Sequence, residues 1–318
     1  MIIKRILFLY VFLCLLCRAE AQIDTTYIRP LGHRLSVRPF IAKAMLFMNH
    51  EFESGEETNY LPNDPPKIGL GVSFNNTIIS FGYGYGFNFM TDKAYGKTQA
   101  IDFQFHNYGR KFVFDLYFQR YKGFYDDQNS KNIKLFPDME IRQYGAYGHY
   151  VFNHKRYSYI AAFNQDEKQL KSTGSFLLGG GVYNTHIRSD SSFVYNGKNS
   201  FENFQFGISA GYAYTWVLGR YWDISASTTV GINFGGDKFS RFGRKIEVYP
   251  TVSPRVSAGY NRGSWSLGFS YVGNMVFPVM SDKETVNLHT GALQISFVKR
   301  FDLIPVIGNR ADGLLKYF

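Results

Sequence analysis

A cluster of ionisable and amide side chains occupies alternate positions on both sides of a short polar turn. Its members are Asp102, Gln104, His106, Asp115 and Gln119, and Arg255 is a more distant candidate. Antiparallel pairing across the turn would bring these side chains onto one face. Two carboxylates and an imidazole in a confined space suit acid–base chemistry, cation binding or ion selection in a pore. The alternative is an internal ion-pair network that fills the fold, with Arg255, Arg300 or Lys43 as partners.

A second candidate is the polar stretch 164–175, which interrupts an otherwise regular alternation. Its charged members are Asp166, Glu167, Lys168 and Lys171. Such a stretch is either an ordinary solvated loop or an insert that constricts the interior of the fold. Sequence alone leaves both interpretations open.

Recognised catalytic and metal-binding motifs are absent from the sequence. There is no HExxH, GxSxG, phosphate-binding loop or CxxC pattern, so we expect no metal and no cofactor. A Ser–His hydrolase would need a hydroxyl next to a histidine. His149 and His186 lie in strand-like segments, but the sequence places no hydroxyl partner beside either of them. Catalysis is therefore the least favoured role, although enzymatic activity stays undecided.

The elements that would position these residues are strands, because the hydrophobic pattern repeats every two residues. The alternation is clearest in 77–89, 203–216, 222–234 and 264–277. In each segment one face is aliphatic and aromatic, while the other carries Gly, Ser, Thr, Asn and Gln. A soluble sandwich would place Lys and Glu on its outer face. Small polar side chains opposite large apolar ones are typical of a transmembrane β-barrel with a polar lumen.

Short and long connections alternate along the chain, as in barrels with short periplasmic turns and longer extracellular loops. The short turns lie near 75–76, 109–111, 153–156, 218–220 and 261–263; the long loops lie near 50–66, 90–97, 126–138, 188–202, 235–247 and 278–287. These connections predict twelve antiparallel strands. The stretch 157–187 is too long for one pass, so it holds either an inward insert or an extra turn that raises the count to fourteen.

The first 21 residues have the features of a secretory signal peptide. Lys4 and Arg5 precede the apolar run 6–17, and cleavage is expected between Ala21 and Gln22. The run is too short for a transmembrane helix. The predicted organisation is a signal peptide (1–21), a periplasmic N-terminal segment (22–34), an outer-membrane barrel (35–301) and a C-terminal tail (302–318).

The composition of the 318 residues supports an exported β-protein. The chain holds 31 Phe and 24 Tyr, and only 19% of its residues are charged. So many apolar residues exclude a disordered chain. Both cysteines fall within the expected signal peptide, which excludes a disulfide scaffold. The net charge of +10 is spread singly through turns, so a nucleic-acid partner is not expected.

Several segments resemble a family of unknown function from Bacteroidetes-type Gram-negative bacteria. The segments are GRKFVFDLYFQRYKG (109–123), YVFNHKRYSY (150–159), QLKSTGSFLLGG (169–180), SAGYAYT (209–215) and SWSLGFSYVGN (264–274). The resemblance extends over about residues 30–301. It implies an outer-membrane β-barrel, and it brings no activity, substrate or site residues.

Three functional hypotheses follow from the sequence. The first is an outer-membrane barrel that passes or binds small polar solutes through a narrow, porin-like lumen. The second is a barrel that acts as an enzyme or an interaction surface through its extracellular loops. The third is a secreted soluble β-protein. For the barrel hypotheses, the expected partners are outer-membrane lipid, the barrel-assembly machinery and a small polar solute.

Overall fold

The computed structural model describes residues 23–31, 35–74, 77–83, 88–128, 132–190, 193, 198–237, 247–280 and 283–301. The expected signal peptide, its cleavage site at Ala21–Gln22 and the C-terminal tail lie outside these residues. No helix among the described residues is long and apolar enough to cross a membrane.

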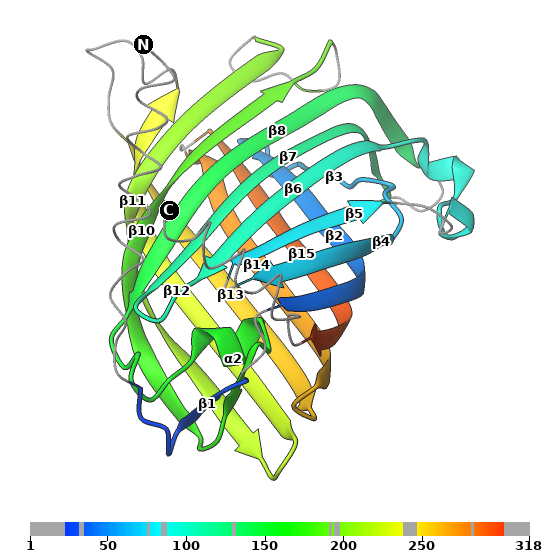
Figure 1. Cartoon of the computed structure of the whole chain (residues 1–318). Helices are drawn as coiled ribbons and strands as arrows, with labels where there is room; N and C mark the ends of the chain where they lie inside the picture. The colour runs from blue at the N-terminus through cyan, green and yellow to red at the C-terminus, as the bar shows by residue number, and fades with distance from the viewer. Residues whose placement is uncertain are drawn as a thin grey trace, which may run out of the picture.

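An antiparallel sheet that closes on itself forms the body of the molecule (Figure 1). Its strands are β2 (Leu35–Phe52), β3 (Glu57–Tyr60), β4 (Lys67–Phe74), β5 (Thr77–Tyr83), β6 (Gln99–Tyr108), β7 (Phe112–Asp126), β8 (Lys134–Val151), β10 (Thr173–Arg188), β11 (Ser200–Leu218), β12 (Trp222–Asp237), β13 (Glu247–Asn261), β14 (Trp265–Met280) and β15 (Glu284–Phe301). Pairing of β15 with β2 closes the barrel.

The barrel has twelve strand positions in the part that the structure describes. Its sheet order contains 13 strands, but β3 and β4 pair with opposite ends of β2 and therefore share one position. The short 3-10 turns η1 (Asn88–Met90) and η2 (Lys93–Tyr95) lie between β5 and β6. The predicted all-β barrel of twelve strands is confirmed.

The strands are longer than the alternating segments alone predict. β2 and β15 have 18 residues each and β11 has 19, whereas a tilted strand needs only about 9–11 to cross a bilayer. Most of the extra length lies at the long-loop end, where β12 runs to Asp237 and β14 to Met280, three residues past their alternating segments. The long loop expected at 278–287 is therefore wrong, because β14 runs to Met280 and β15 begins at Glu284. Ladder hydrogen bonds between these strands replace most of that loop.

The strand faces follow the predicted alternation through most of the wall. On β12, Val230 and Ile232 are exposed on the outside, whereas Ser225, Thr229 and Asn233 are buried inside. The outer surface is therefore apolar and the adjacent interior is lined by small polar groups.

The interior is not polar along its whole length, which corrects the prediction of a polar lumen. An apolar cluster fills the long-loop half, with members from β2, β3, β7, β8, β10, β11, β14 and β15. The Phe193 ring lies 5.3 Å from the His50 ring and 6.5 Å from the Tyr60 ring. This end of the barrel is packed like the core of a soluble protein.

The stretch between β8 and β10 folds as an inward insert rather than an extra hairpin, which leaves the count at twelve. It contains the helix α2 (Tyr159–Phe163) and the strand β9 (Glu167–Gln169). Ser158 caps α2 by accepting a hydrogen bond from the Ala161 amide at 2.9 Å. β9 pairs with β1 (Ile28–Pro30), so the N-terminal segment is folded with the insert at the short-turn end (Figure 1).

Candidate functional site

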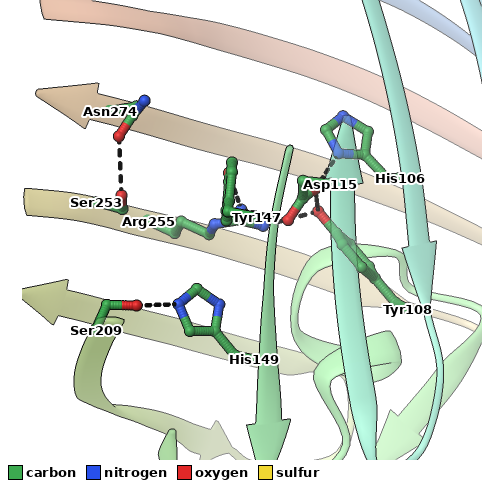
Figure 2. Close-up of polar contacts among 9 residues, drawn as sticks. All are labelled: His106, Tyr108, Asp115, Tyr147, His149, Ser209, Ser253, Arg255 and Asn274. Atoms are coloured by element: carbon green, nitrogen blue, oxygen red, sulfur yellow. Dashed lines mark hydrogen bonds and ion pairs between the residues drawn. The ribbon is translucent and has the colours of Figure 1, made fainter. Parts of the chain in front are cut away.

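A buried ion pair joins opposite walls of the barrel. Arg255 on β13 donates from Nη2 to Oδ2 of Asp115 on β7 across 2.7 Å. Arg255 also donates to the hydroxyls of Tyr108, at 2.9 Å, and Tyr147 (Figure 2). Only 3% of Arg255 and 1% of Asp115 is exposed. Because the two opposite charges compensate each other away from water, the ion pair links the two walls across the lumen. We refer to the Asp115–Arg255 pair as the strut.

His106 extends this network along the β6–β7 hairpin. His106 lies opposite Asp115 in the register, and its Nδ1 is hydrogen-bonded to the Asp115 carboxylate (Figure 2). The guanidinium of Arg255 also lies 5.4 Å from the ring centroid of Tyr147 and 5.8 Å from that of Tyr159. Because Tyr159 belongs to α2, the insert touches the strut directly.

The remaining predicted residues form a second group beside the first. Gln104 donates to Asp102 Oδ1 at 3.1 Å, and Gln119 donates to Asp102 Oδ2 at 3.2 Å. All six residues of the predicted cluster thus meet inside the barrel, in two adjacent groups. Of the three basic residues proposed as partners of this cluster, only Arg255 contacts it among the described residues. Lys43 instead donates to the Asp64 carbonyl, and Arg300 lies 3.9 Å from Asp166.

A cavity of about 30 Å³ lies between these groups and the facing wall. Its lining includes Gln104, His106, Tyr117, Asn274 and Thr290. This volume holds about one or two water molecules. At this point the side chains leave room for little more than ordered water.

The four charged insert residues divide into two inner and two outer ones. Asp166 accepts a hydrogen bond from Ser73 at 2.6 Å, and Glu167 pairs with Arg110 and Ser158. The other two lie at the rim: Lys168 Nζ is 5.3 Å from the Tyr221 ring centroid and Lys171 Nζ is 5.0 Å from that of Tyr27. Asp166 and Glu167 thus contact the barrel wall at the short-turn end, and their role in constricting the interior stays a prediction.

Burial governs the protonation of the insert. It raises the pKa of Glu167 above its usual value, although the neighbouring Arg110 acts in the opposite direction. For Lys168, partial burial lowers the pKa, and the positive charges of Arg29 and Arg220 lower it further.

Wall residues hold the insert in place, and of these the sequence singled out only Arg300. Arg38 on β2 donates to the Asn164 carbonyl and side-chain oxygens, and Arg300 on β15 donates to the Gln165 carbonyl. From β13, Ser257 donates to the Ala162 carbonyl at 2.5 Å. Their inward positions in the alternation were readable from the sequence, but their partners were not.

The structure also supplies a hydroxyl partner for one histidine. His149 Nε2 lies 3.1 Å from Ser209 Oγ (Figure 2). Within the described residues, no hydrogen bond joins the other ring nitrogen of His149 to a carboxylate, so the pair lacks the orienting acid of a catalytic triad. The described part of the chain also contains no group of three or more His, Cys, Asp or Glu side chains that could hold a metal ion.

Comparison with known families decides the affiliation of the chain. Residues 22–301 match the family described as "Domain of unknown function (DUF4421)". The chain belongs to this family. As the sequence resemblance implied, DUF4421 brings no assigned activity. The DUF4421 chain matches none of the curated proteins with which it was compared.

Solved structures similar to this DUF4421 chain include several outer-membrane proteins. The outer membrane protease OmpT of Escherichia coli has a TM-score of 0.36 and 9% identity, over 84% of this chain and 97% of that one. The outer-membrane OmpT of Vibrio cholerae has a TM-score of 0.27 and 9% identity, over 84% and 98%. The toluene transporter TodX of P. putida has a TM-score of 0.24 and 7% identity, over 88% and 94%.

Proposed function

We propose that this DUF4421 chain is an outer-membrane β-barrel whose lumen is closed at rest, and that small polar solutes enter or cross it only when the insert moves. The membrane location is supported by the apolar outer wall. Exposed side chains such as Phe176 (69%), Ile208 (67%) and Val230 (58%) would be unfavourable in water but suit lipid.

The observation that carries the proposal is the way the insert is held. It contacts β2 through Arg38, β4 through Ser73, β13 through Ser257 and β15 through Arg300. Water can replace these hydrogen bonds when the insert leaves, whereas the apolar side chains of α2, which pack at rest in a buried cluster with residues of β8, β10 and β11, would then be exposed. Beyond the insert lies the polar cavity, and beyond that the apolar cluster. Entry from the short-turn end would first have to pass the insert, so the geometry favours entry gated by the insert.

Conductance across planar bilayers tests this proposal. We expect the wild-type chain to give almost no current. A variant in which residues 158–171 are replaced by a short Gly–Ser turn should give discrete conductance steps, because the short-turn end is then open. Heat-modifiable migration in detergent gels would show that both proteins have folded.

Each alternative result is informative. A conducting wild type would contradict the closed lumen. A folded but silent insert-deleted variant would mean that the apolar cluster alone seals the barrel, and solute passage would be abandoned. Wild-type protein that stays soluble and monomeric without detergent would contradict the membrane location itself.

A further inference from the structure

Four basic side chains lie together on the outer wall near the long-loop end. They are Arg120 and Lys122 on β7, Arg142 on β8 and Arg188 on β10, and we refer to them as the arginine patch. Their sequence neighbours Tyr121, Ile141 and Ile187 are fully buried inside the barrel. Since successive side chains of a strand point to opposite faces, the patch faces outward.

The strand register brings the patch around a single carboxylate. Arg120 lies directly opposite Arg142, and Lys122 and Arg188 both lie opposite Glu140 from the two neighbouring strands. Arg120 donates to Glu140 at 2.8 Å, Arg142 is in direct contact with it, and the Arg188 guanidinium is 3.8 Å away. These strands lie side by side on one wall of the barrel (Figure 1).

One carboxylate does not balance this positive charge. Glu140 is only 1% exposed because the arginines cover it, while their own side chains remain 38%, 32% and 53% exposed. Each guanidinium carries five N–H donors, and the two oxygens of Glu140 occupy only a few of them. The outer surface of the patch is therefore a set of cationic donors open to the surroundings.

The nearest other acids on this face already have partners. Asp138 accepts hydrogen bonds from the Ser189 hydroxyl at 2.7 Å and from the Asp190 amide at 2.8 Å. Glu202 on β11 accepts a hydrogen bond from Asn184 at 3.2 Å. These partners are uncharged, so Asp138, Glu140 and Glu202 together set three negative charges against the four positive charges of the patch, and a net positive charge remains on this wall.

An apolar surface begins immediately on the membrane side of the patch. The rings of Phe118 and Tyr144 lie 5.0 Å apart, two residues from Arg120 and Arg142 respectively. Tyr144 is 47% exposed and Val182 on β10 is 43% exposed. Basic side chains on a lipid-facing wall are strongly unfavourable at the membrane centre and only slightly so near its surface. The boundary between the patch and the apolar wall therefore lies at the level of lipid headgroups.

We propose that the arginine patch binds the phosphate groups of an anionic membrane lipid in the leaflet on the long-loop side, with the acyl chains lying against Leu116, Phe118, Tyr144 and Val182. This inference rests on the proposed membrane location. Guanidinium groups bind phosphate oxygens in paired, charge-assisted hydrogen bonds. The patch spans three strands, which are about 4.8 Å apart, so it is wide enough for a phosphorylated sugar headgroup.

Native mass spectrometry of the full chain in detergent tests the proposal. The probes are lipid A with two phosphates, the same lipid with both phosphates removed, and sodium phosphate. The test variant carries Arg120→Gln, Glu140→Gln, Arg142→Gln and Arg188→Gln; replacing Glu140 as well avoids leaving a buried carboxylate unpaired. Its matched control is Arg220→Gln with Arg262→Gln, which removes the same net charge of two from the short-turn end.

We expect the wild type and the control to bind diphosphorylated lipid A alike, and the patch variant to bind it about 30-fold more weakly. Each net positive charge near an anionic lipid contributes roughly fivefold. Equal binding by the patch variant would overturn the proposal. So would equal binding of the dephosphorylated lipid, or sodium phosphate binding as tightly as the lipid, which would reveal a simple anion site. Heat-modifiable migration of all three proteins separates these outcomes from failure of the barrel proposal itself.

Discussion

Asp115 and Arg255 depend on each other because neither charge is accessible to water. Removing one partner of a buried ion pair leaves the other uncompensated, at a cost of about 3–5 kcal/mol. We therefore expect Asp115→Asn to lower the free energy of unfolding by about that amount, measured by denaturant titration in detergent micelles. The Asp115→Asn/Arg255→Met double variant should recover much of the loss, since both charges are then absent.

The matched control for this prediction is Asp102→Asn. Asp102 accepts hydrogen bonds from the uncharged amides of Gln104 and Gln119, and it is partly exposed. Its replacement should cost no more than about 1.5 kcal/mol. Equal losses for Asp102→Asn and Asp115→Asn would contradict the strut, because the ion pair would then contribute nothing beyond an ordinary hydrogen bond.

The stability of the folded insert should depend on pH through the protonation of Glu167. Its pKa in the fold lies above its usual value of 4.5, chiefly because of burial, so the fold binds its proton more tightly than the unfolded chain does. This contribution to stability is complete below pH 4.5 and is lost as the pH rises through the raised pKa. Hydrogen exchange at residues 159–169 should therefore be slower at pH 5 than at pH 7, after correction for the intrinsic rate. The Glu167→Gln variant should show a smaller difference, and an unchanged one would assign the effect to another group.

At the scale of elements, β1 and β9 form a two-stranded sheet that ties the N-terminal segment to the insert. Ile28 is 0% exposed, and β1 is paired through only three residues. Ile28→Ala removes buried apolar volume at a cost of about 2 kcal/mol or more. We expect exchange at the β9 amides to become about 30-fold faster, without a change in the β11–β12 hairpin. The exposed neighbour gives the control: Arg29→Ala should leave β9 protected, and equal loosening by both variants would contradict the role of the buried side chain.

The parts of this architecture that the sequence could predict are those set by local pairing. The contact of His106 with Asp115 follows from alternation plus a short turn, which fixes the register of the hairpin. By contrast, the partner of Arg255 lies across the lumen, and the partner of Arg38 lies in the insert 126 residues away. Such contacts depend on closure of the barrel and on the path of the insert. Neither feature produces a periodic pattern in the sequence from which the contact could be predicted.

The apolar cluster was missed for a related reason. Leu46 and Met48 occupy alternate positions on β2 just as lipid-facing residues do on other strands, but they are buried inside. Alternation separates two faces without stating which one points inward. Where both faces carry apolar residues, only the three-dimensional packing against Tyr121 and Ile141 identifies the inner one.

At the scale of the whole molecule, the apolar outer wall is expected to make stability depend on membrane depth. Ile208 lies near the middle of β11 on the apolar outer wall and is 67% exposed. Leu218 is the last residue of the same strand, next to the short turn, and is 51% exposed. A lysine on the lipid face costs about 2–4 kcal/mol near the bilayer midplane and about 0–1 kcal/mol near its surfaces. We expect Ile208→Lys to lose the larger amount and Leu218→Lys the smaller, measured as unfolding free energy in phospholipid vesicles. In a water-exposed barrel both substitutions would be nearly neutral, so equal and small losses would contradict insertion of this wall into lipid.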